Sequence, residues 1–216
     1  MNKSRPHNSR FAKAGVSCFY DSEVLNSSFV HLMKFSAENP RLRKAANRYR
    51  QIQMTATEDI RDIFSILHDG GVTAWKGNNS LLTLTVECDY LAELIDKSFD
   101  RFYVELYNID ELFLTTWPNP FDLPVQTLTE LSDIFESELE LLSANIKEGK
   151  VVIDCCQQDI KFDYCGGNLT ISCEKIKVYD QNINELTVEQ LDIICNTYWD
   201  NARKEIEKGI IERNRK

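Results

Sequence analysis

The sequence predicts an α+β fold with N-terminal helices, an antiparallel sheet of about seven strands, a middle helix and a C-terminal helix. Three observations support this prediction. Before residue 70, apolar residues recur at every third or fourth position, as in helices that pack on one face. After residue 71, apolar and polar residues alternate, as in strands. The gaps between the expected strands are mostly short, and short connections join antiparallel strands.

The first third of the chain is expected to hold a basic tail and three helices. Residues 1–20 are polar and basic, which predicts a flexible tail. A short helix is expected over residues 24–35. Another begins at residues 39–40, where an asparagine cap precedes a proline at the first helical position. The third begins at residues 55–57 and ends at the glycine pair 70–71, because glycine readily takes the left-handed conformation that ends a helix.

The alternating segments that follow predict the sheet. The clearest lies at residues 81–88, where one face would be buried and the other solvated. Gly166-Gly167 predicts a tight turn between the last two strands. We expect strands at residues 72–75, 81–88, 102–106, 112–117, 151–156, 160–164 and 169–178, and a short helix at residues 91–95.

Two further helices are expected, and each begins at a threonine that can form a capping box. The pair Thr127 and Glu130 begins a helix that would run to about residue 142. The pair Thr187 and Gln190 begins the C-terminal helix, whose apolar residues as far as Ile206 would be buried.

The length of 216 residues fits one domain that can bury a full core. We expect the flexible basic tail at residues 1–20, a single domain over residues 21–208, and a frayed charged tail over residues 209–216. Within the domain, residues 21–70 would form a helical part and residues 71–208 the part that contains the sheet.

The charge is unevenly distributed. The net charge is −9, yet residues 1–50 contain ten Lys and Arg against three Asp and Glu. Residues 102–146 contain nine acidic residues and no Lys or Arg. Such asymmetry bears on partners rather than on fold. The N-terminus does not resemble a signal peptide, and the longest uncharged apolar stretches are too short to cross a bilayer, so we expect a cytoplasmic protein with no membrane contact.

The seven cysteines do not predict a disulfide framework or a zinc site. Their number is odd, their spacing is irregular, and no two are separated by two residues. Most occupy apolar positions of expected strands, where a thiol acts as a small core side chain. The adjacent Cys155 and Cys156 would point to opposite faces of a strand.

The most distinctive local motif is His68-Asp69-Gly70-Gly71, followed by a short strand with an aromatic residue, Trp75, and then by the alternating strand. This arrangement resembles a motif of small bacterial α+β proteins, some of which are immunity proteins of polymorphic toxin systems. The resemblance covers roughly residues 60–117. The resemblance implies a related α+β fold, and it implies no catalytic residues.

A second interpretation of the same motif is a metal-dependent hydrolase. His31, the dyad His68-Asp69 and Asp110 can be placed on the pattern of HD-type phosphohydrolases. That family's dyad lies inside a helical bundle, whereas strands follow this one at once. The structural explanation is simpler: a histidine in the last turn interacts with the helix dipole, and Asp69 helps to form the turn.

We therefore expect a non-enzymatic interaction protein, in which an acidic surface binds a protein partner such as a basic toxin. No nucleotide-binding loop, glycine-rich dinucleotide motif or nucleophile elbow is present, and we expect no cofactor and no metal. The candidate binding residues are His68, Asp69, Trp75, Asp110, Glu111, Glu130, Asp133, Glu136, Glu138 and Glu140.

Two alternatives remain for the charged segments. The basic residues 1–50 can contact nucleic acid, although those of residues 41–50 circle the expected helix rather than lining one face. The basic and acidic segments can also pair with each other, which explains the asymmetry without a nucleic acid.

Overall fold

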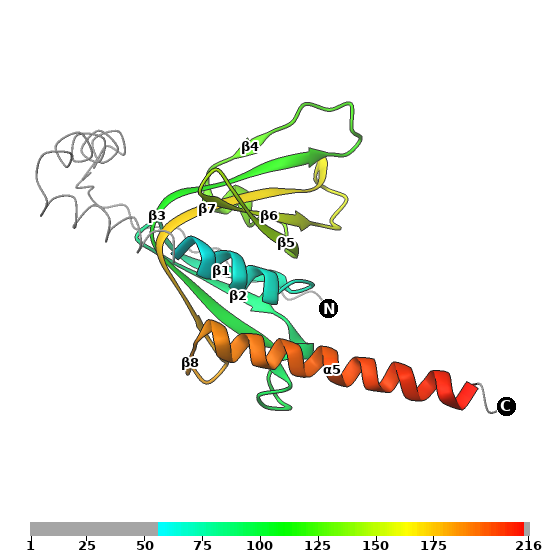
Figure 1. Cartoon of the computed structure of the whole chain (residues 1–216). Coiled ribbons are helices and arrows are strands. Elements are labelled where there is room, and N and C mark those ends of the chain that lie inside the picture. The colour runs from blue at the N-terminus through cyan, green and yellow to red at the C-terminus, as the bar shows by residue number, and fades with distance from the viewer. Residues whose placement is uncertain (1–55, 214–216) are drawn as a thin grey trace, which may run out of the picture. The chain divides into compact units, whose positions relative to one another are not determined.

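The computed structural model describes residues 56–213, with side chains described as far as residue 208 (Figure 1). The expected basic tail, the helices expected before residue 55, His31 and Cys18 lie outside the described residues. Within the described range the protein is α+β, as predicted. One antiparallel sheet of eight strands is accompanied by a helix before it and a long helix after it.

The strands are β1 (Gly71–Asn78), β2 (Leu81–Glu87), β3 (Arg101–Pro118), β4 (Thr127–Leu128), β5 (Leu139–Lys147), β6 (Lys150–Cys156), β7 (Tyr164–Tyr179) and β8 (Glu185–Leu186). The helices named here are α3 (Asp89–Ala92), α4 (Leu131–Ile134) and α5 (Val188–Arg213). The first described helix covers residues 56–66.

The sheet closes on itself. Its strand order is β4-β3-β2-β1-β5-β6-β7-β8, and β3 also pairs with β7. Six strands therefore form a ring, in the order β3, β2, β1, β5, β6 and β7. The short strands β4 and β8 pair with the two longest strands of the ring, β3 and β7. The β3–β7 ladder runs from Tyr103 opposite Tyr179 to Pro118 opposite Tyr164. In contrast, β1 and β5 share only two residue pairs, which we call the seam of the ring.

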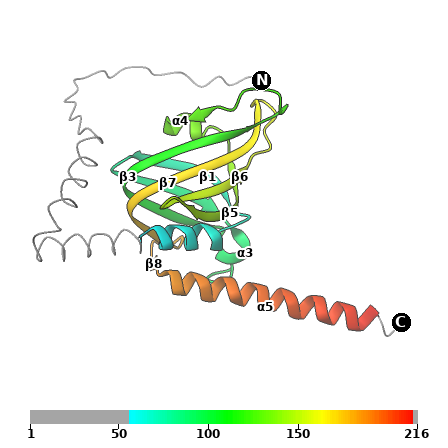
Figure 2. The same ribbon diagram turned by 45° about the horizontal axis from the view of Figure 1, so that its top comes forward.

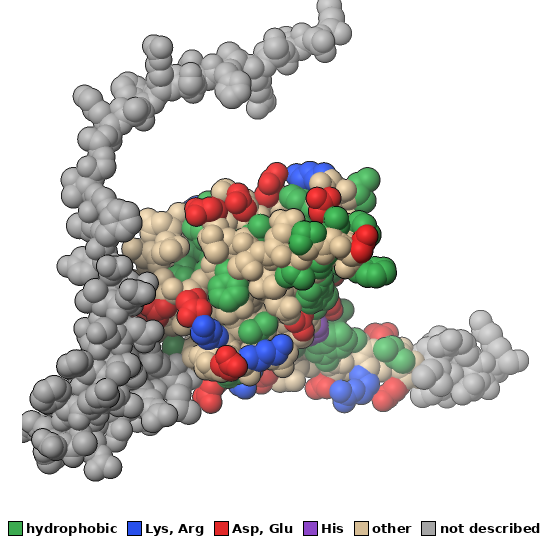
Figure 3. Space-filling model, turned by 90° about the horizontal axis from the view of Figure 1, so that it is seen from above, with side chains coloured by type: hydrophobic (Ala, Val, Ile, Leu, Met, Phe, Trp, Pro, Cys, Tyr) green, Lys and Arg blue, Asp and Glu red, His purple; other side chains and the backbone are tan. Residues whose placement is uncertain are grey.

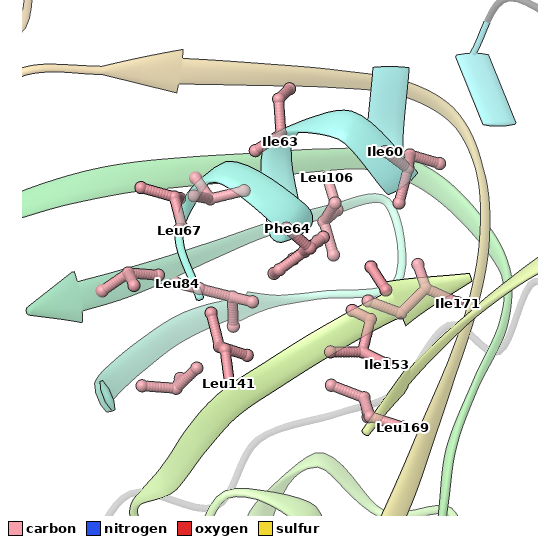
Figure 4. Packing of buried hydrophobic residues seen from close by; sticks show 14 of the residues in the cluster. Ile60, Ile63, Phe64, Leu67, Leu84, Leu106, Leu141, Ile153, Leu169 and Ile171 are labelled. Atoms are coloured by element: carbon pink, nitrogen blue, oxygen red, sulfur yellow. The ribbon is translucent and has the colours of Figure 1, made fainter. Parts of the chain in front are cut away.

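The helix at residues 56–66 packs against the inside of the curved sheet (Figure 2). Its apolar residues recur at helical spacing, so one face meets the strands. Phe64 is fully buried and points toward the strands, with Leu84 and Leu106 among its surroundings (Figure 4). The core is completed from the other side of the ring by Leu141, Ile153, Leu169 and Ile171, which are also fully buried.

Several predicted elements are confirmed. The first described helix ends at residue 66, before the glycine pair, and the left-handed residue of the turn is Asp69 (φ 62°) rather than a glycine as expected. The hairpin β1–β2 follows, with Asn79 and Ser80 between the strands. The strand expected at residues 151–156 matches β6, and a short helix near residue 91 is present as α3. The capping box of α5 also forms: the backbone N–H of Thr187 donates to Gln190 Oε1 (2.8 Å), and that of Gln190 donates to Thr187 Oγ1 (3.2 Å).

The helix predicted over residues 127–142 is wrong. Only α4, a single turn without a side-chain cap, lies there, and Thr127 belongs to β4. Leu139 begins β5 and is buried together with Leu141, while Leu142 is exposed. Leucines at positions 139 and 142 fit helical spacing, but the ring needs a strand between β1 and β6, and this segment supplies it.

Three further expectations about strands are corrected. The segments at residues 102–106 and 112–117 are parts of one strand, β3, which passes an irregularity between Ile109 and Glu111. The segment at residues 160–164 is a loop as far as Asp163. The predicted turn at Gly166-Gly167 lies inside β7, paired with both β3 and β6.

The C-terminal helix begins where expected and extends past Gly209 to Arg213. Its burial differs from the prediction. Leu191 is fully buried and Tyr198 packs against the core, but Ile206 is 62% exposed because the helix extends beyond the sheet (Figure 1). Among residues 56–213, no helix combines the length and the apolar character needed to span a membrane.

Candidate binding site, an acidic groove

A groove of about 880 Å³ lies at the seam of the ring. It is lined by eight acidic side chains and one basic side chain, Lys161. The acidic residues are Asp69, Glu87, Asp89, Asp100, Glu136, Glu138, Glu140 and Asp159. We call this surface the acidic groove.

Strand register brings these distant residues together. Gly71 at the start of β1 is paired on one side with Glu87 of β2 and on the other with Glu140 of β5. Glu136 and Glu138 lie just before β5, and Asp159 and Lys161 lie in the loop between β6 and β7. The groove therefore forms where the turn after the first helix meets the ends of three neighbouring strands.

The His-Asp-Gly-Gly turn fastens the seam. The backbone N–H of Asp69 donates to the Leu141 carbonyl (2.7 Å), and that of Leu141 donates to the Gly70 carbonyl (2.9 Å). The Tyr90 hydroxyl donates a hydrogen bond to the His68 carbonyl oxygen (2.6 Å). Asp69 adopts a positive φ of 62°, which aspartate tolerates better than most residues. A Cβ atom on Gly70 would lie 2.9 Å from the Leu67 carbonyl oxygen, so the turn needs glycine there.

The His68 ring is held beside the groove by three contacts. Its Nδ1 lies 2.8 Å from the Ser65 carbonyl oxygen, which can only accept, so Nδ1 carries the hydrogen. Its Nε2 lies 3.8 Å from Asp69 Oδ2. The ring stacks on Trp199 of α5, with the centroids 5.9 Å apart and the planes 9° apart. These contacts connect the seam to the C-terminal helix.

Part of the negative charge is neutralised locally. Arg101 donates to Asp100 Oδ2 (2.8 Å) and lies 3.9 Å from Glu87, and its hydrogen bond lowers the pKa of Asp100. Lys161 lies 3.7 Å from Glu136 and 3.5 Å from Asp159.

Three carboxylates of the groove have no cationic partner among the described residues. Within the described residues, Asp89, Glu138 and Glu140 form no ion pair with a lysine or arginine. Glu140 Oε2 instead accepts from the Cys156 thiol at 3.2 Å. Burial, together with this carboxylate, raises the pKa of Cys156 to about 11, so its thiol stays neutral at physiological pH.

The structure brings together part of the predicted site. Asp69, Glu136, Glu138 and Glu140 line the acidic groove, with His68 beside it. Sequence reasoning missed Glu87, Asp89, Asp100 and Asp159, which lie outside the base-free stretch at residues 102–146. Only the cross-strand register at Gly71 reveals that Glu87 is a neighbour of Glu140.

The other predicted residues lie apart from the groove. Trp75 and Glu130 line a second hollow of about 540 Å³, and Asp133 is exposed on α4. Asp110 and Glu111 lie in β3, where Glu111 forms a 2.6 Å ion pair with Lys150. Partial burial raises the pKa of Asp110, and the negative charge of Glu111 raises it further.

Asp110 does not line the groove beside His68 and Asp69. Among the side chains described as far as residue 208, no three of the types His, Cys, Asp and Glu are arranged so that they could hold a metal ion.

Comparison of the chain with protein-family models, with curated protein sequences and with solved structures returns no match.

Proposed function

We propose that this protein is a non-enzymatic binding protein whose acidic groove receives a basic segment of a partner protein. The observation that carries this proposal is the concentration of eight carboxylates around one groove with a single lysine. Like charges held this close repel one another, and a cationic partner removes that repulsion. Complementary charge also speeds association and disfavours wrong partners.

Exposed apolar side chains beside the groove favour a protein as the partner over a small cation. Ile160 stands between the groove residues Asp159 and Lys161 and is 99% exposed. Phe121 is 93% exposed on a neighbouring loop, which the hydrogen bond from the Asn119 N–H to the Asp163 carbonyl (2.9 Å) holds beside the Ile160 loop. Apolar anchors next to charged groups are typical of protein interfaces.

Neutralisation of a toxin is the form of this function that we propose. A protein that covers a basic nucleic-acid-binding or catalytic surface needs an acidic face and no chemistry of its own. The resemblance of the His68-Asp69-Gly70-Gly71 motif to some immunity proteins supports the same proposal.

The test compares two variants with equal changes in net charge. In the groove variant, Glu136→Gln, Glu138→Gln and Glu140→Gln are combined. In the control, Asp122→Asn, Asp192→Asn and Glu207→Gln are combined, and none of these lines the groove. Binding of a poly-lysine peptide is measured by calorimetry at low and physiological salt, and any basic protein encoded beside this gene is tested in the same way.

We expect the groove variant to bind at least about tenfold more weakly, which is about 1.4 kcal/mol, and the control to bind nearly as the natural protein does. Equal weakening of both variants would mean that overall charge, and not the groove, attracts cations. Co-expression then tests neutralisation: if the natural protein does not protect cells from the neighbouring gene product, the toxin proposal fails even where peptide binding succeeds.

A further inference from the structure

The second hollow, of about 540 Å³, lies between the β1–β2 turn and the start of α4. One wall consists of Trp75 and Asn78 of β1 together with the turn residues Asn79 and Ser80. The other wall consists of residues 129–132. This hollow shares no lining residue with the acidic groove, so the two surfaces can hold different ligands. We call it the tryptophan hollow.

Backbone hydrogen bonds hold both walls in place. The carbonyl oxygen of Asn79 accepts from the N–H of Ile109 (2.7 Å), which fixes the turn on β3. The carbonyl oxygen of Glu130 accepts from the N–H of Ile134 (3.0 Å), which begins α4. The hollow is therefore built on two walls that a ligand does not have to order.

The Trp75 side chain supplies a flat apolar surface in the hollow. Its indole is partly buried and packs against the core. The Phe135 ring supports it, with the ring centroids 6.2 Å apart and the planes tilted by 38°. Because the ring is held by these contacts, a ligand that stacks on it pays little for fixing its position.

The polar side chains of the hollow are not used by the fold. Asn79, Thr129 and Glu130 are exposed. Among the described residues, nothing forms a hydrogen bond or an ion pair with these three side chains. The Asn78 Oδ1 atom accepts from the Ser80 N–H (2.8 Å), which leaves its amide NH₂ group as a donor.

The charge of the lining favours an uncharged ligand. Of the described residues that line the hollow, none is a Lys or Arg, and Glu130 is the only acidic one. On the face seen in Figure 3, Lys and Arg lie scattered among acidic and uncharged polar side chains. A phosphate or carboxylate ligand would meet the charge of Glu130 without a lining cation to hold it. A cationic ligand is attracted more strongly by the eight carboxylates of the acidic groove.

We propose that the tryptophan hollow binds a saccharide, with one face of a sugar ring stacked on Trp75. A pyranose ring presents C–H groups on a face and hydroxyl groups around its edge, which matches a flat apolar side chain surrounded by polar ones. A sugar hydroxyl both donates and accepts hydrogen bonds, as the hydroxyl and amide side chains of the lining do. The Glu130 carboxylate can accept from two neighbouring hydroxyls. This proposal does not depend on the function of the acidic groove.

The first test titrates the full chain with maltose, cellobiose, lactose, chitobiose and mannobiose, and follows tryptophan fluorescence and the heat of binding. We expect at least one of these sugars to bind with a Kd of about 1 mM or tighter. Adenosine and guanosine are the comparison ligands, because they are uncharged and can also stack on an indole. Failure of every sugar to bind, or tighter binding of a nucleoside than of any sugar, would overturn the proposal.

Substitutions of Trp75 test the stacking. Trp75→Leu keeps an apolar side chain but removes the flat ring, so it should weaken sugar binding at least about tenfold. Trp75→Phe keeps a flat ring and should bind more tightly than Trp75→Leu. Thermal unfolding shows whether each variant remains folded, since this side chain also packs against the core. Equal sugar binding by two folded variants would contradict the stacking on Trp75.

A second pair of variants leaves the core untouched. The hollow variant combines Asn79→Ala with Thr129→Ala. The control combines Asn182→Ala with Thr197→Ala, which remove the same groups from exposed positions outside the hollow. Sugar binding should weaken at least about tenfold in the hollow variant and stay unchanged in the control. Equal effects of the two changes would overturn the proposal.

Poly-lysine binding separates this site from the acidic groove. The variant that combines Asn79→Ala with Thr129→Ala should bind the peptide as the natural protein does. A parallel loss of sugar and peptide binding in this variant would contradict a separate saccharide site. Normal peptide binding without any sugar binding would overturn only the saccharide proposal and leave the function proposed for the groove intact.

Discussion

Two glycines in β7 set how closely three strands can approach. A Cβ atom on Gly167 would lie 2.5 Å from the Thr115 carbonyl oxygen and 2.8 Å from Leu114 Cδ1, and Gly166 faces the backbone of Cys155 in the same way. The pair therefore permits β3 and β6 to lie tightly against β7, where a turn had been predicted.

We predict that Gly167→Ala destabilises the fold by about 2–3 kcal/mol, because backbone atoms of β3 would have to move. Gly71→Ala is the control: its Cβ atom would meet nothing nearer than Thr73 Cγ2 at 3.8 Å. Urea unfolding of both variants provides the measurement. If Gly167→Ala unfolds at the same urea concentration as the natural protein, the close approach does not limit stability.

The buried thiol of Cys155 predicts that the folded protein loses stability in alkaline solution. Burial raises the pKa of Cys155 to about 12 from 9.0. The pKa of this thiol is higher in the folded protein than in the unfolded chain. Its contribution to the free energy of unfolding is therefore complete below pH 9 and is lost as the pH rises toward about 12. From pH 8 to pH 10 we expect a loss of about 1 kcal/mol from Cys155 alone.

Cys155→Ala isolates this effect, since lysines and tyrosines also titrate in that range. The variant should lose about 1 kcal/mol less than the natural protein between pH 8 and pH 10, as measured by urea unfolding. Equal losses in the two proteins would contradict the assignment to Cys155.

Among the elements, the helix at residues 56–66 determines whether the ring has a core. Phe64 is fully buried in the hydrophobic core that the helix forms with the strands of the ring. We predict that Phe64→Ala costs about 3–5 kcal/mol, because the cavity lies where all these strands converge. Phe121→Ala, at a side chain that is 93% exposed, should change stability by less than about 0.5 kcal/mol. Thermal and urea unfolding measure the stability change of each variant. If Phe64→Ala and Phe121→Ala change stability by similar amounts, the core does not depend on this helix.

The elements also show where sequence reasoning succeeds. Alternation predicted β2 and β6, and the Thr187–Gln190 pair predicted the start of α5, because these signals are local. Residues 139–147 were missed, since the spacing of Leu139 and Leu142 fits a helix and only pairing with β1 and β6 makes the segment a strand. Likewise, Asp69 and Glu138 could be predicted as site residues from the sequence. Glu87 could not, because only its pairing with Gly71 across the strands places it at the groove.

Over the whole molecule, a net charge of −9 and the acidic groove predict that salt stabilises the fold. Raising the ionic strength from about 0.02 M to about 0.3 M shortens the screening length from roughly 20 Å to roughly 6 Å, which weakens the repulsion between carboxylates. We expect the melting temperature to rise by about 3 °C. Glu138→Gln should raise it at low salt and have less effect at high salt, whereas Asp122→Asn outside the groove should change it little. A melting temperature that is independent of salt would show that these charges do not oppose folding.

The seam between β1 and β5 makes the ring open at a defined place. Two residue pairs and the turn at Asp69 hold it, whereas the β3–β7 ladder spans most of two long strands. Local opening proceeds where the fewest hydrogen bonds must break. In hydrogen–deuterium exchange, the amides of Asp69 and Leu141 should therefore exchange well before those of the β3–β7 ladder, although Leu141 is fully buried. The groove that we assign to partner binding lies on this same seam, so a partner held there would slow the exchange of both amides.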